Sequence, residues 1–183
     1  MSTERIFVPA SRYDELVSAL REAWKTLKNK EARALCKTPA AERVNEMIAD
    51  AKRKGAKPLL DPKEYTQNDE ASGSGPAFIQ PNIFGPATED MKIFREETFG
   101  PVSVVIPIED IGRDEEHVIT DMVNKANDSE YGLTAAVWSK ELSKAKRVAR
   151  RLEAGAIHIN SPVSKGINPL NLGATIGPDQ NED

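Results

Sequence analysis

Two carboxylates and an aromatic ring stand directly before the most apolar stretch of the chain. Glu96, Glu97 and Phe99 lie in the segment Lys92-Ile93-Phe94-Arg95-Glu96-Glu97-Thr98-Phe99-Gly100-Pro101-Val102. Carboxylates accept hydrogen bonds and a ring offers apolar contact, so this segment could meet a ligand. The simpler interpretation is a turn that happens to be acidic. That interpretation leaves Phe99 unexplained, because nothing local requires an exposed ring before a Gly-Pro turn.

The other residues capable of chemistry lack the partners that their chemistry requires. The glycines at 73 and 75 are followed by neither the helix nor the lysine of a phosphate-binding loop. His117 and His158 have no second ligand at helical or hairpin spacing, and a metal site needs convergent ligands. Cys36 has no histidine nearby, so we interpret it as a small buried apolar residue. The sequence therefore predicts no catalytic residue and no metal ligand in this chain.

Composition and charge exclude several classes of protein. The chain has 183 residues, with 25 Lys and Arg against 29 Asp and Glu, which gives a net charge of −4. A basic patch marks nucleic-acid binding, so no nucleic-acid partner is expected. The positive residues at 52–54 and 144–151 stand among carboxylates and are interpreted as solvated helix faces. No apolar run reaches the roughly 18 residues of a membrane span, and one cysteine fits a reducing compartment, so we expect no membrane partner and a cytoplasmic location.

The first half of the chain predicts a strand, two helices and a loop. The apolar run Ile6 to Val8 ends at a proline and predicts a short strand. Ser11, followed by acidic residues, predicts the start of a helix. A second helix is expected from Thr38-Pro39 to a C-terminal cap at Gly55. The polar residues 61–76 predict a loop.

The second half alternates strands with helices. Val102 to Ile108 is apolar on both faces, which predicts a strand with helices on both sides. Ala77 to Ile79 is a weaker strand candidate. Further on, we expect a helix at 115–126, a strand at 133–138, a helix at 141–152 and a strand at 156–160. This order predicts an α/β fold with an open, mostly parallel sheet and flanking helices.

Four segments, in this order, resemble one known family. They are Ser2-Thr3-Glu4-Arg5-Ile6-Phe7-Val8, Glu-Glu-x-Phe-Gly-Pro-Val at 96–102, Ala126 to Trp138, and Leu152 to Asn160. Together they resemble the NAD(P)-dependent aldehyde dehydrogenases. Within that family, the sequence of these segments is most similar to the vanillin and salicylaldehyde members. The resemblance implies that residues 1–160 form the C-terminal part of the family's catalytic domain, in incomplete form. Residues 161–183 are divergent, and we expect them to be a flexible tail.

The resemblance implies roles for individual residues. Glu97 matches the residue that accepts hydrogen bonds from the nicotinamide-ribose hydroxyls, for which an acceptor-only carboxylate is suited. Phe99 matches the residue that packs near the nicotinamide, and the cofactor would be NAD or NADP. Asn127, Tyr131 and Gly132 are expected to shape the fold, as a helix end and the turn into the next strand. Asn160 matches a residue near the mouth of the substrate tunnel, although an asparagine that caps the next turn explains it equally well.

The resemblance also implies that the catalytic residues of the family lie outside this chain. The nucleophilic cysteine is expected just upstream of Met1, and the general-base glutamate and the dinucleotide-binding domain lie further upstream. We therefore expect this chain alone to bind NAD(P) weakly or not at all and to leave aldehydes unoxidised. Three interpretations stay open: a truncated enzyme, a non-catalytic interaction module, and one half of a split enzyme. In each case uncovered apolar surface predicts self-association or an N-terminal complementing half.

Overall fold

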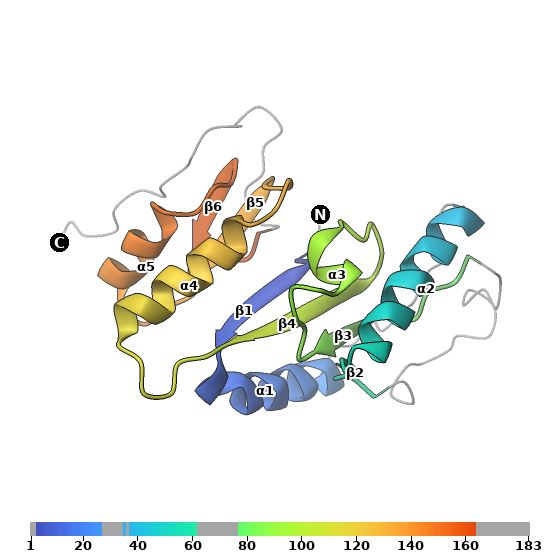
Figure 1. Ribbon diagram of the computed structural model, residues 1–183, viewed down its shortest axis with the longest axis horizontal. Helices are drawn as coiled ribbons and strands as arrows, with labels where there is room; N and C mark the ends of the chain where they lie inside the picture. Colours follow the sequence, from blue (N-terminus) through green and yellow to red (C-terminus); the bar gives the residue numbers. More distant parts are fainter. Residues whose placement is uncertain (1–2, 27–34, 36, 62–76, 164–183) are drawn as a thin grey trace. The chain divides into compact units, whose positions relative to one another are not determined.

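The computed structural model describes residues 3–26, 35, 37–61 and 77–163 (Figure 1). The chain divides into two compact units, one of residues 4–113 and one that contains residues 114–163. Each unit has a sheet of its own. Within the described ranges, no helix is both long and apolar enough to cross a membrane.

The sheet of the first unit is built around one buried strand. Its strands lie in the order β1 (Arg5–Pro9), β4 (Val102–Ile108), β3 (Asn82–Gly85) and β2 (Lys57–Pro58). β4 pairs in parallel with both β1 and β3, and β2 pairs antiparallel with β3. All the aliphatic side chains of β4 are buried. The predictions of a mostly parallel sheet and of a central strand at 102–108 are therefore confirmed.

Different helices cover the two faces of this sheet. The helices of the unit are α1 (Tyr13–Thr26), α2 (Thr38–Arg53) and the short α3 (Lys92–Arg95). Val8 and Val105 pack with Val17 of α1 in one buried cluster. Successive strand side chains point to opposite faces, so Phe7 lies on the other face. Its ring meets that of Phe94 in α3 edge to face, with 6.3 Å between the centroids, and α2 packs against α3.

The boundaries of the first two helices agree only in part with those predicted from neighbouring residues in the sequence. The helix expected at Ser11 begins at Tyr13, after a short 3-10 turn over Ala10–Arg12. Ser11 does not cap it: its N–H and its hydroxyl both donate to the carboxylate of Asp110, just after β4. The second helix begins at Thr38, and Gly55 follows its end with a φ of +102°, as expected of a glycine cap.

One expected strand is wrong. Ala77 to Ile79 does not form one of the sheet strands, and the pairing with β4 begins instead at Asn82. Asn82 is a buried polar residue, and apolar alternation gives no signal for it. Its side-chain amide exchanges hydrogen bonds with the backbone N–H and carbonyl of Leu60, at 3.3 and 3.2 Å. Most of the loop expected at 61–76, with the glycines at 73 and 75, lies outside the described residues.

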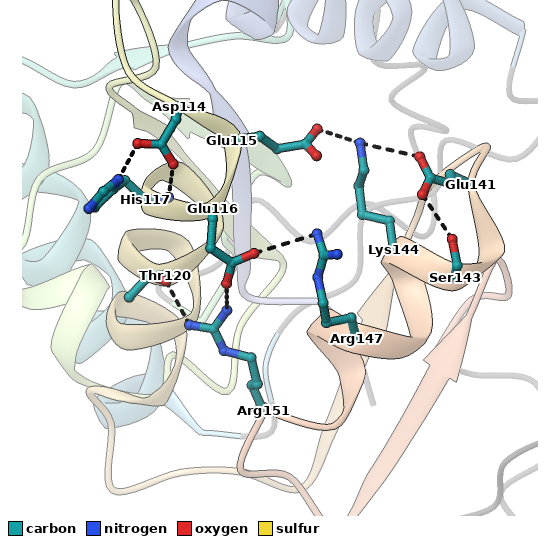
Figure 2. A network of polar contacts seen from close by, with 10 residues as sticks. All are labelled: Asp114, Glu115, Glu116, His117, Thr120, Glu141, Ser143, Lys144, Arg147 and Arg151. Atoms are coloured by element: carbon teal, nitrogen blue, oxygen red, sulfur yellow. Dashed lines mark hydrogen bonds and ion pairs between the residues drawn. The ribbon is translucent and has the colours of Figure 1, made fainter.

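The second unit consists of two helix-strand pairs. They are α4 (Glu115–Asn127) with β5 (Thr134–Val137) and α5 (Leu142–Ala149) with β6 (Ala156–Ile159). β5 and β6 pair in parallel, and all four elements lie where the sequence predicts them. Ion pairs join α4 to α5 (Figure 2): Lys144 contacts Glu115, and Arg147 pairs with Glu116 at 3.5 Å, while Arg151, just after α5, donates to Glu116 at 2.8 Å. The positive charges of Lys144, Arg147 and Arg151 are therefore paired within their own unit.

Three residues stabilise the segments that connect the helices and strands of this unit. The side chain of Asn127 donates to the carbonyl of Arg151 at 2.8 Å and accepts from the N–H of Glu153 at 3.0 Å. A Cβ at Gly132 would stand 2.6 Å from the carbonyl oxygen of Glu153, so only glycine fits there. Asn160 has a φ of +50°, and its amide exchanges two hydrogen bonds with the backbone of Ser139. The fold-shaping role expected of Asn127 and Gly132 is confirmed, whereas the side chain of Tyr131 is exposed and its N–H donates locally to the hydroxyl of Ser129.

Replacing Ile108 with alanine is expected to lower the free energy of unfolding by about 2–5 kcal/mol, because it leaves a cavity beside β4. Ile108 is 1% exposed, whereas Ile111 is 75% exposed. The matched substitution Ile111→Ala is expected to change stability by less than about 0.5 kcal/mol. Urea denaturation of the full chain measures both. Equal effects would show that β4 is not the centre of the core.

Candidate functional site

The acidic segment singled out in the sequence forms a loop between α3 and β4. Glu97 is half-buried, Thr98 is 1% exposed and Phe99 is 72% exposed. Phe99 has a φ of +47°, in the left-handed region that residues other than glycine rarely adopt. That conformation costs about 1–2 kcal/mol. The loop thus holds a large ring in solvent at a cost that other interactions must offset.

The carboxylate of Glu4, immediately before β1, binds the middle of this loop. One oxygen accepts from the Thr98 N–H at 2.9 Å. The other accepts from the Thr98 hydroxyl at 3.0 Å and from the Phe99 N–H at 3.3 Å. All three partners are donors, which matches a carboxylate because its oxygens only accept. The negative charge strengthens each bond, so Glu4 stabilises the backbone turn that exposes Phe99.

The guanidinium of Arg43, on α2, binds the carbonyl groups of the same loop. It donates to the carbonyl of Glu97 at 2.8 Å and to that of Thr98 at 2.7 Å. The guanidinium places two donors on separate nitrogens of a rigid planar fork, which matches two neighbouring acceptors, whereas a lysine carries all its donors on one nitrogen. Gly100 adds a close approach to the same helix, since a Cβ there would stand 2.9 Å from a methyl group of Val44. The loop is therefore fixed to both β1 and α2.

A buried carboxylate fixes the helix that precedes the loop. Asp50, near the end of α2, accepts from the N–H of Lys92 at 2.9 Å and pairs with the ammonium of Lys54 at 3.1 Å. The hydrogen bond from Lys92 lowers the pKa of Asp50 below its ordinary value, and it outweighs the opposite effect of desolvation. The charged form of Asp50 is thus part of the folded structure.

The other candidates from the sequence do not join this loop. His117 is exposed, and its ring and its N–H contact Asp114, whose pKa these bonds lower (Figure 2). His158 carries a buried ring nitrogen with no hydrogen-bond partner in the part of the chain that the structure describes. The described residues include no group of three His, Cys, Asp or Glu that could hold a metal ion. Cys36 lies outside the described residues.

The geometry of the loop suits recognition of a ligand that is partly polar and partly aromatic. Glu97 offers acceptor oxygens, and Phe99 offers an exposed apolar ring two residues away. The backbone between them is immobilised through Thr98, so both side chains start from defined positions. Neither Glu4 nor Arg43 was singled out from the sequence, because they contact the loop across 94 and 54 residues. The only sequence signal for Glu4 is its place in the opening segment that resembles the family.

Comparison with known proteins gives a consistent result. Residues 1–173 match the model of the aldehyde dehydrogenase family. Vanillin dehydrogenase of Pseudomonas sp. (strain HR199 / DSM 7063) is 34% identical over 169 residues, which are 88% of this chain and 31% of that protein. Among solved structures, salicylaldehyde dehydrogenase from Pseudomonas putida G7, complexed with salicylaldehyde, has a TM-score of 0.70 at 28% identity and covers 89% of this chain and 32% of its own.

A third relative is similar to the same extent. NADP-dependent glyceraldehyde-3-phosphate dehydrogenase from Bacillus halodurans C-125, complexed with NADP, has a TM-score of 0.70 at 25% identity, over 90% of this chain and 32% of its own. The structure therefore matches about a third of the α/β fold of solved aldehyde dehydrogenases. The chain belongs to the aldehyde dehydrogenase family and spans about a third of the length of the relatives it matches.

Replacing Arg43 with lysine is expected to lower the free energy of unfolding by about 1–3 kcal/mol, because the single nitrogen of an ammonium cannot reproduce the two separate, parallel donors that reach the two loop carbonyls. Arg53→Lys on the same helix is the control, since the Arg53 side chain is 69% exposed and its ion pair with Asp50 is long, at 3.5 Å. Urea denaturation compares the two. Equal losses would mean that the loop does not depend on the fork of Arg43.

Asp50→Asn is expected to change how stability depends on pH. Folding lowers the pKa of the Asp50 carboxylate, so its charge contributes stability at pH values above its unfolded pKa of about 4. That contribution is lost as the pH falls through the folded pKa. The variant should therefore be less stable than the parent at neutral pH, and the difference should shrink below about pH 4. Thermal unfolding across this range measures it, and a difference that is independent of pH would contradict the assignment.

Proposed function

We propose that this chain is the nicotinamide-facing part of an NAD(P)-dependent aldehyde dehydrogenase, which oxidises an aldehyde to a carboxylate. Glu97 accepts hydrogen bonds from the ribose hydroxyls next to the nicotinamide, and Phe99 packs against the nicotinamide ring. The observation that carries this proposal is the loop itself, which presents an acceptor and an exposed ring from a backbone bound by Glu4 and Arg43. A nucleotide with an aromatic head fits these two side chains. When bound, NAD(P) supplies the hydride acceptor.

The proposal assigns no catalytic residue to this chain. The cysteine that attacks the aldehyde and the glutamate that activates water belong to a part of the enzyme upstream of Met1, as the family resemblance implies. The chain alone therefore binds NAD or NADP weakly or not at all and does not oxidise aldehydes. It acts as a truncated catalytic domain, and a split enzyme or a non-catalytic interaction module is the alternative.

The exposed apolar side chains of the second unit favour a binding partner. They are the large side chains of Tyr131, Leu133, Trp138 and Leu142. No residue of β5 or β6 is fully buried within the described chain. An N-terminal complementing half or a second copy of the chain would cover this surface. The proposal places the protein in the cytoplasm, in keeping with its single cysteine.

The test is reconstitution. The full chain is mixed with the part of Pseudomonas vanillin dehydrogenase that precedes the matched residues, and reduction of NAD or NADP by vanillin is followed. The parent mixture should reduce the cofactor. Glu97→Gln should lower kcat/KM for the cofactor by about 10- to 100-fold, as loss of hydrogen bonds to a charged group does.

The control for this variant is Glu96→Gln, which makes the same change at the neighbouring exposed residue and should leave kcat/KM unchanged. Two well-folded parts that reduce no cofactor would contradict the proposed function. An immunoblot of the source cells distinguishes a fragment of a longer enzyme from a short protein that acts with a partner. A band about three times the 20.1 kDa of this chain indicates a fragment of a longer enzyme, and a band at 20.1 kDa indicates a short protein with a partner.

A further inference from the structure

Glu4 connects two parts of the molecule that the proposed function requires to work together. Its backbone carbonyl accepts from the N–H of Val104 at 2.8 Å, which ties it to the central strand. Its side chain receives the N–H and hydroxyl of Thr98 and the N–H of Phe99. One residue therefore fixes the start of β1, the strand β4 and the loop between Glu97 and Phe99.

The chemistry of these contacts requires an ionised carboxylate. Glutamine has one acceptor oxygen, and its amide group would bring two donors against the three donors of the loop. The buried Thr98 would then lose at least one hydrogen bond, and the left-handed backbone at Phe99 would lose the interaction that offsets its cost. Loss of the Glu4 charge should therefore release the loop while β4 keeps its other neighbours.

We infer that Glu4 is a positioning residue for hydride transfer, and this inference rests on the proposed function. The family resemblance puts the nucleophile just before Met1, so Glu4 lies a few residues along the same segment. By holding Thr98 and Phe99 to that segment, Glu4 sets the distance between the carbon that is oxidised and the ring that Phe99 supports. Small errors in such a distance lower the rate of the chemical step steeply.

The first test uses the full chain without cofactor and measures amide hydrogen exchange. In Glu4→Gln, the amides of Thr98 and Phe99 should exchange about 10- to 100-fold faster, while those of Val104 and Val105 in β4 keep their rates. Glu96→Gln is the control with the same change of charge and should alter none of them. Unchanged rates at Thr98 and Phe99, or an equal rise throughout β4, would overturn the inference.

The second test uses the reconstituted enzyme. Glu4→Gln should lower the rate of hydride transfer in a single turnover by about tenfold or more, and a deuterated aldehyde should show a larger isotope effect on kcat. Hydrolysis of an activated aryl ester, which needs the nucleophile but no hydride acceptor, should keep its rate. An equal loss of ester hydrolysis would overturn the inference. If the parent mixture reduces no cofactor, the proposed function fails, and hydrogen exchange alone decides whether Glu4 positions the loop.

Discussion

Two charged side chains of opposite sign hold three residues of backbone, and the candidate site depends on them. Glu4 accepts from the N–H groups of Thr98 and Phe99, and Arg43 donates to the carbonyls of Glu97 and Thr98, so four backbone groups of the loop have charged partners. Charged hydrogen bonds of this kind are strong enough to offset the left-handed conformation of Phe99. Without these hydrogen bonds, the left-handed backbone conformation that exposes the Phe99 ring would be unfavourable.

The sheet determines where these two side chains can act. Glu4 stands at the start of β1, which pairs with β4, and Arg43 comes from α2, which packs on the small helix leading into the loop. β4 begins soon after the loop, and its aliphatic side chains are all buried. The loop is therefore held at both of its ends as well as in its middle. Such preorganisation reduces the entropy that a bound ligand would otherwise cost.

Much of the fold was predictable because its signals are local, and the support of the site was not. The apolar run at 102–108, the proline at the start of α2 and Gly55 each report on neighbouring residues, and the structure confirms them. The strand expected at Ala77 to Ile79 and the helix start expected at Ser11 are wrong, because the structure here depends on Asn82 and Ser11, whose partners Leu60 and Asp110 lie far away in the chain. The same holds for the contacts of Glu4 and Arg43 with the loop. Glu97 and Phe99 were recognisable only through a resemblance, since composition alone permits an acidic turn.

The most direct test of this account is a crystal structure of the reconstituted enzyme with bound NAD or NADP. The account predicts that the Glu97 carboxylate lies within hydrogen-bonding distance of the ribose hydroxyls and that the Phe99 ring packs against the nicotinamide. The contacts of Glu4 with Thr98 and Phe99 should be those of the free chain. A nicotinamide ribose bound away from Glu97, with the loop unchanged, would contradict it.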